Sequence, residues 1–147
     1  FIKEKIVKSL NIKRKIQRKR IYISRNKTKK RRLLNEKDIL NILKKYNFEK
    51  IYVEDLAFKE QVELFHSAEI VVAPTGAGLA NIIFSGNLMV LELFPPNFIN
   101  QHYFFLCKTL KFHRRYIIGY EEFDNQDFLV DSTELENLVK EMINDLN

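Results

Sequence analysis

The chain has 147 residues, which fits one domain of ordinary size, and its 46% hydrophobic content is enough for a packed core. A single cysteine, Cys107, excludes an internal disulfide, and no apolar run approaches the roughly 20 residues that a membrane-spanning helix needs. Basic residues are concentrated at the start: residues 1–32 hold 15 of the 25 lysines and arginines and one acid, Glu4, so the remainder is net acidic.

The basic segment has two open interpretations. Its clusters Lys13-Arg14-Lys15 and Arg18-Lys19-Arg20 could bind nucleic acid, acidic membranes or phosphate groups, or they could form a solvated linker. Apolar residues at helical spacing over 2–12 predict an amphipathic helix, packed on the domain or on a missing neighbour. We therefore predict a basic helix and linker over 1–19 and one α/β domain over 20–147.

Strand and helix patterns alternate along the rest of the chain. Short apolar runs predict strands over 21–23, 50–53, 69–73, 88–93 and 115–118. Helices are predicted over 36–46, 58–67, 78–85, 101–111 and 135–146, the first with an Asn35–Asp38 capping box. The aromatic residues, including Phe104 and Phe105, are interpreted as core. Alternation of this kind is typical of a Rossmann-like, doubly wound parallel sheet.

In such a sheet, ligands bind beyond the carboxyl ends of the strands, and this rule points to three loops. The first loop, 25–34, is basic and follows the first strand. Arg25 could hold a diphosphate through paired hydrogen bonds, and Arg32 is a second candidate in the same loop. Both could instead be ordinary surface cations.

The second loop contains two closely spaced glycines. Gly76 and Gly78 permit backbone angles and close approaches that side chains forbid, and the helix that follows offers free N–H groups to an anion. The predicted binding residues are Thr75, Gly76, Ala77, Gly78, Leu79 and Asn81. Because position 81 is Asn, the full Gly-x-Gly-x-x-Gly pattern is absent, and we do not expect a dinucleotide cofactor.

The third loop follows Glu92, which lies near the end of an otherwise apolar strand. A buried carboxylate needs partners, and Glu92 could accept hydrogen bonds from ribose hydroxyls or form a salt bridge with Arg25 or a helix N-terminus. The chain has no Asp-x-Asp motif, and its histidines lack ligand spacing with Cys107. We therefore expect no metal and no other cofactor.

Several segments together resemble glycosyltransferase family 61. The resemblance rests on residues 22–25, 32–36, 60–65 and 68–74, and most strongly on 76–81 followed by 92–95; order and spacing agree over 20–118. It implies a GT-B-type enzyme with two Rossmann-like domains facing a cleft, of which this chain looks like the C-terminal, nucleotide-binding half. Because the chain begins with Phe1 and not Met, we expect an N-terminal domain to precede it in a longer protein.

The resemblance also implies the chemistry. The family transfers sugars from UDP-sugars to glycans or other hydroxyl acceptors, with inversion and usually without a metal. Matching positions imply phosphate contacts from Arg25 and the Gly76–Gly78 turn, and a nucleoside contact near Glu92. Many members have His where this chain has Thr75, so a hydroxyl would replace an imidazole. Inversion needs a general base; the sequence identifies none, so we expect it on the other domain and little turnover by this chain alone.

The Lys- and Asn-rich composition favours a microbial, cytoplasmic enzyme of surface-glycan synthesis, with at most weak contact between the basic segment and a membrane surface. A location in the secretory lumen is the alternative and would require an anchor. Two other functions stay open. The first is an inert α/β scaffold whose basic arm, 1–32, binds nucleic acid or acidic lipid, although the chain has no recognised nucleic-acid motif. The second is a non-catalytic relative of the family.

Overall fold

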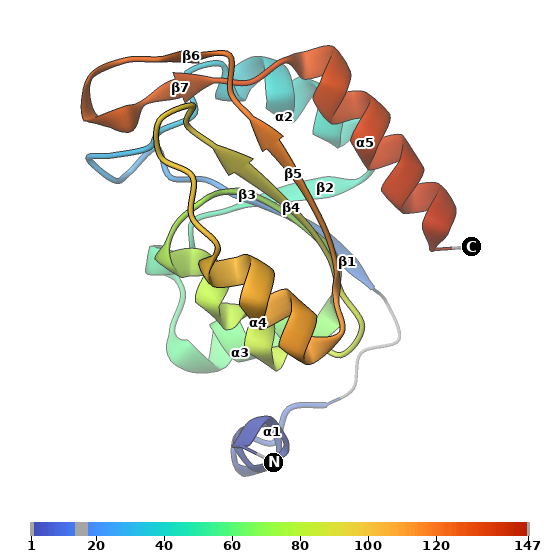
Figure 1. The fold of residues 1–147 in the computed structure, drawn as a ribbon. Coiled ribbons are helices and arrows are strands. Elements are labelled where there is room, and N and C mark those ends of the chain that lie inside the picture. The colour runs from blue at the N-terminus through green and yellow to red at the C-terminus, as the bar shows by residue number, and fades with distance from the viewer. Residues whose placement is uncertain (1, 14–17, 147) are drawn as a thin grey trace.

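The computed structural model describes residues 2–13 and 18–146 and shows an α/β architecture around one parallel sheet (Figure 1). The strands follow the order β2-β1-β3-β4-β5, and every neighbouring pair is parallel. They are β1 (Lys19–Ile23), β2 (Phe48–Ile51), β3 (Ala68–Pro74), β4 (Met89–Phe94) and β5 (His113–Ile118). The predicted Rossmann-like parallel sheet is therefore confirmed.

Helices cover both faces of this sheet (Figure 1). One face carries α2 (Glu36–Lys44) and α5 (Ser132–Asp145), which pack against each other. The other face carries α3 (Phe58–Ser67), the 3₁₀ helix η2 (Ala77–Phe84) and α4 (His102–Leu110). Covering both faces removes the sheet from water and explains why its inner strands are mostly apolar.

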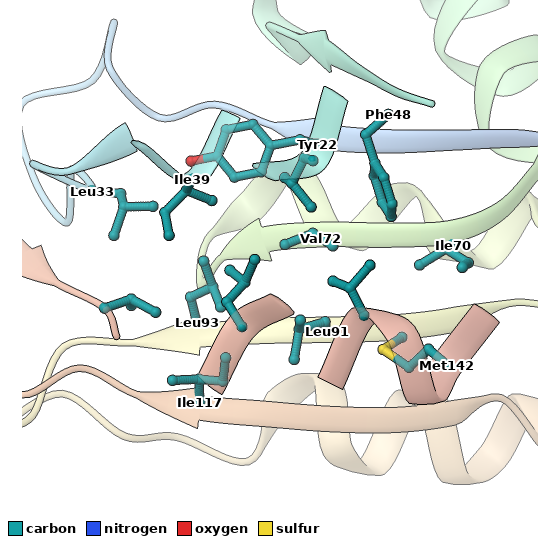
Figure 2. Close-up of a cluster of buried hydrophobic side chains, with 14 of the residues drawn as sticks. Tyr22, Leu33, Ile39, Phe48, Ile70, Val72, Leu91, Leu93, Ile117 and Met142 are labelled. Carbon is teal, nitrogen blue, oxygen red and sulfur yellow. The ribbon is translucent and has the colours of Figure 1, made fainter. Parts of the chain in front are cut away.

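Alternate residues of each strand point into two separate apolar clusters. Tyr22, Val72 and Leu91 are buried in the cluster beneath α2 and α5 (Figure 2). Their neighbours Ile21 and Val71 are buried in the cluster on the opposite face, beneath α3, η2 and α4. This period of two is the geometry of an extended strand. The two clusters fix the sheet from both sides, so the loops at its carboxyl end extend from a rigid support.

The N-terminal helix packs on the domain itself. Helix α1 (Ile2–Ser9) has the predicted amphipathic character, and Ile6 and Leu10 contact the apolar cluster that includes η2. Lys3 Nζ donates a hydrogen bond to the carbonyl of Ser85, at 2.9 Å. No helix within the described residues has the length and apolar character needed to span a membrane.

The two basic clusters differ in what the structure shows of them. In the first, Arg14 and Lys15 lie outside the described residues. In the second, Arg20 forms a 2.8 Å ion pair with Glu69, and Lys19 lies 3.8 Å from Glu49. Both residues belong to β1, so part of this cluster is built into the sheet.

The helix predicted over 78–85 is present as the 3₁₀ helix η2. Two other local predictions were wrong. Asn35 does not cap α2: its amide donates to the carbonyl of Val130 at 2.7 Å and its Oδ1 accepts from the Val130 N–H, so a tertiary contact replaces the capping box. Phe104 and Phe105 are 42% and 56% exposed, because α4 turns one side of its surface to solvent beside the edge strand β5.

A small hairpin near the C-terminus was not predicted. It pairs β6 (Glu121–Glu122) with β7 (Phe128–Leu129) in antiparallel fashion, and η3 (Asp124–Gln126) joins them. The predicted strand over 50–53 is β2, two residues earlier, and the 3₁₀ turn η1 (Val53–Asp55) follows it. Through β7 the hairpin contacts the loop after β1, because Leu33 forms a bridge with Phe128.

Candidate functional site

The carboxyl ends of β1 and β3 lie side by side at the point where the strand order reverses. The chain runs from β1 to β2 on one side, and from β3 to β4 on the other. In an open parallel sheet, such a point leaves a crevice in which ligands bind. Two of the three predicted loops meet here: Arg25 follows β1, and Gly76 follows β3.

The guanidinium of Arg25 lies directly against the backbone of Gly76. A Cβ atom added at Gly76 would lie 2.0 Å from Nη1 of Arg25 and 2.8 Å from its Cζ, closer than any real contact. Gly76 has an extended backbone, with φ 167° and ψ 173°, so it is required here for space and not for an unusual angle. The turn after β3 and the guanidinium after β1 therefore form one surface.

A second guanidinium lies close to the first. Burial lowers the pKa of Arg25, and the positive charge of Arg31 lowers it further, while Glu54 acts in the opposite sense. Arg31 stacks on Phe98, with its Cζ 4.5 Å from the ring centroid. The Nε atoms of both arginines are buried without a hydrogen-bond partner among the described residues. Two neighbouring cations with unused donors favour an anion between them.

Side chains from α4 and the loop before it hold the glycine turn in place. The hydroxyl of Tyr103 donates to the carbonyl of Gly76 at 2.7 Å, and Asn100 Nδ2 donates to Oγ1 of Thr75 at 3.3 Å. Thr75 is buried and its N–H donates to the carbonyl of Leu93. The Thr75 hydroxyl oxygen accepts from Asn100, which holds this side chain at the end of β3.

Glu92 is fully buried, and its partner is Arg114 instead of Arg25. Arg114 donates from Nη2 and Nε to Oε1 of Glu92, at 2.7 and 3.1 Å, while Oε2 has no hydrogen-bond partner within the described part of the chain. Burial raises the pKa of Tyr103 and the charge of Glu92 adds to this rise, whereas Arg25 opposes it. Glu92, Arg25 and the Gly76 turn therefore gather around Tyr103 at the same end of the sheet.

A cavity of about 280 Å³ opens beside this cluster, between α4 and the strands β4 and β5. Its walls are Phe94, Ile99, Asn100, Gln101, Phe104, Arg114, Tyr116 and Ile118. Asn100 belongs both to this wall and to the hydrogen bond with Thr75, so one side chain connects the cavity wall to the glycine turn. Arg114 lies 5.8 Å from the ring centroid of Phe104 and 5.4 Å from that of Tyr116. The exposed Phe104 is thus a cavity wall and not core.

The other predicted binding residues have structural contacts of their own. The Arg32 guanidinium binds Asp127 through Nη2 at 2.7 Å and Nε at 3.1 Å. Leu79 is buried, and Asn81 donates to the carbonyl of Gly78 within its own turn. Ala77 is exposed at the start of η2, and a Cβ at Gly78 would lie 3.3 Å from Ile23. Arg25, Thr75 and Gly76 are therefore brought together, whereas Arg32 is held on Asp127.

Four residues at the site were not predicted: Arg31, Asn100, Tyr103 and Arg114. Arg31 stands next to Arg32 in a basic run, so a signal existed, but nothing local distinguishes the two arginines. The other three reach the glycine turn or Glu92 across more than 20 residues of sequence. No spacing rule within one segment could have found them.

Ligands for a metal do not gather in the described residues. There, no group of three or more His, Cys, Asp or Glu side chains could hold a metal ion. His66 on α3 lies with Nδ1 3.2 Å from the carbonyl of Phe84, a contact inside the fold. Burial raises the pKa of the Cys107 thiol to about 11, so this thiol is protonated at neutral pH.

Comparison with known protein families gives one match. Residues 1–97 match the sequence model of the family described as Glycosyltransferase 61. The matched segment contains Arg25, Arg31, the Gly76 turn and Glu92, and it ends before Asn100, Tyr103 and Arg114. No curated protein matches the chain significantly.

Proposed function

We propose that this chain, which belongs to glycosyltransferase family 61, binds the nucleotide-sugar donor of a sugar transfer to a hydroxyl acceptor. The donor we assign is a UDP-sugar, and the transfer inverts the anomeric centre. The observation that carries this assignment is the Arg25 guanidinium lying against the Gly76 backbone, with Arg31 beside it.

Diphosphate is the group that fits these cations. A guanidinium binds two phosphate oxygens through parallel hydrogen bonds, and Arg25 and Arg31 place two guanidinium groups close together. Negative charge on the diphosphate grows as the bond to the sugar breaks. Fixed positive groups at that position stabilise the transition state more than the bound donor, which is how they accelerate transfer.

We assign the nucleoside to the cavity beside Asn100. Its volume of about 280 Å³ is near the lower end of ligand pockets, which suits a nucleoside better than a larger group. Phe104 and Tyr116 offer aromatic surfaces to a base, and the amides of Asn100 and Gln101 offer hydrogen bonds. Glu92 then contributes mainly by holding Arg114 in the cavity wall.

The acceptor and the general base belong, in this proposal, to a second Rossmann-like domain that faces the crevice. Inversion requires a base to remove the proton of the attacking hydroxyl. The groups gathered around Arg25 and Gly76 are donors and cations, which suit the leaving group and not proton abstraction. We therefore expect this chain alone to bind donor with little or no transfer.

Calorimetric titration with UDP tests the proposal. Arg25→Ala should weaken UDP binding at least about tenfold, because one charge-assisted pair is lost. Arg115→Ala is the matched control: this arginine is exposed on β5, where it lies 3.6 Å from Glu141, and its removal should leave UDP affinity unchanged. Absence of UDP binding by the intact chain, or equal affinities of Arg25→Ala and Arg115→Ala, would contradict the assignment.

A further inference from the structure

A buried carboxylate holds the two residues that flank Arg25. Glu36, the first residue of α2, is only 4% exposed. Its Oε1 accepts a hydrogen bond from the hydroxyl of Ser24 at 2.6 Å, and its Oε2 accepts from the amide of Asn26 at 2.5 Å. The hydroxyl oxygen of Ser24 also accepts from the N–H of Asn26, at 3.2 Å. One side chain thus fixes the backbone on both sides of Arg25.

We propose that Glu36 is a positioning residue, which directs the Arg25 guanidinium toward the Gly76 turn. This inference rests on the proposed role of Arg25 in binding the donor diphosphate. Hydrogen bonds to an ionised carboxylate are short and strong, and they are stronger still away from water. Because Ser24 and Asn26 are both anchored, Arg25 has little freedom to turn its side chain away from β3.

A cation and a buried phenol lie close to the Glu36 carboxylate. Lys50 Nζ on β2 lies 3.3 Å from Oε2, so a cation compensates the buried carboxylate. Tyr22 packs beneath the same group: burial raises the pKa of its hydroxyl well above the ordinary value, and the charge of Glu36 raises it further. A cation and two hydrogen-bond donors contact Glu36, which is the set of partners that a buried carboxylate requires.

The loop itself does not depend on Glu36 alone. Thr28 closes the turn after Arg25 by donating from its N–H and its hydroxyl to the Arg25 carbonyl, at 2.8 and 2.7 Å. Further along, Leu34 donates to the carbonyl of Phe128. These bonds persist when the Glu36 carboxylate is altered. What Glu36 adds is the direction of residue 25, so its loss should affect ligand binding more than folding.

The test compares UDP with uridine, which lacks the diphosphate, on the full chain. Glu36→Gln leaves one acceptor oxygen in place of the two that accept from Ser24 and Asn26. Asn26→Ala removes the hydrogen bond from Asn26 to Glu36, and because Asn26 is exposed we expect the variant to fold. Both should weaken UDP binding about tenfold and change uridine binding less than twofold. Glu69→Gln is the matched control, because Glu69 also anchors β1, through Arg20, but at the opposite end of the strand.

A double-mutant cycle with Arg25→Ala separates positioning from general stabilisation. If Glu36 acts through Arg25, then Glu36→Gln should change UDP affinity less than twofold once Arg25 is absent. Equal losses for UDP and uridine, or additive losses in the cycle, would overturn the positioning role. Unchanged UDP binding by Glu36→Gln and Asn26→Ala, with Arg25→Ala still defective, would overturn it too and leave the proposed function intact. Normal UDP binding by the Arg25→Ala variant would instead refute the proposed function itself.

Discussion

At the scale of single residues, the site depends on space over one glycine. The sequence predicted unusual backbone angles or close approaches at the glycine turn, and Gly76 provides a close approach, since its extended backbone is one that any residue could adopt. The Arg25 guanidinium occupies the volume in which a side chain would begin. Gly86 offers a contrast, because a Cβ there would meet nothing within 4 Å.

Gly76→Ala should therefore impair ligand binding without unfolding the protein. The new methyl group must displace the Arg25 guanidinium, so UDP affinity should fall by about tenfold or more, while the melting temperature changes little because alanine tolerates this backbone. Gly86→Ala serves as the control and should bind UDP normally. Calorimetry and thermal denaturation together measure both effects; normal UDP binding by Gly76→Ala would show that the guanidinium is not needed where it lies.

At the scale of elements, the sequence predicts those that bury apolar faces and misses those that do not. The strands and α3 can be predicted from the sequence because their apolar residues form continuous or periodic patterns. The hairpin strands β6 and β7 have two residues each, which is too short for a periodic pattern to be recognised. The hairpin nevertheless matters, because the backbone carbonyl of Asn125 accepts from the N–H of Arg31 and so fixes the backbone at the second arginine.

Asp127 should make the contact between this hairpin and the basic loop dependent on pH. Burial alone would raise the Asp127 pKa, but hydrogen bonds from the side chain and backbone of Arg32 outweigh it and hold the pKa below its ordinary value of 3.8. The ionised form therefore stabilises the fold at neutral pH, and this contribution is lost as the pH falls through the depressed pKa. Urea unfolding should show a free-energy difference between wild type and Asp127→Asn that is constant above about pH 5 and shrinks below about pH 4. Arg32→Gln should show the same trend, and a difference that persists unchanged at pH 3 would contradict this account.

At the scale of the whole molecule, topology creates the site. The ends of β1 and β3 meet because the strand order is β2-β1-β3-β4-β5, in which the chain continues to one side after β1 and to the other side after β3. This explains why Arg25 and the glycine turn could be predicted from a sequence rule about strand ends. Tyr103 and Arg114 could not be predicted in this way. They belong to α4 and β5, and the packing of these elements on η2 and β4 depends on tertiary contacts that no local sequence pattern indicates.

The concentration of basic residues at the N-terminus allows a final prediction, about what residues 1–13 contribute to stability and to UDP binding. Helix α1 is attached by side-chain packing of residues such as Ile6 and Leu10, and Lys3 binds the carbonyl of Ser85, at the end of η2 far from Gly76. Deleting residues 1–13 should lower the melting temperature by roughly 2–6 °C through lost apolar burial, while UDP affinity stays within about twofold. The charge-preserving double variant Ile6→Ala with Leu10→Ala should reproduce the thermal effect. Loss of UDP binding on deletion would instead place the ligand on the basic arm, and the crevice between β1 and β3 would then not be the binding site.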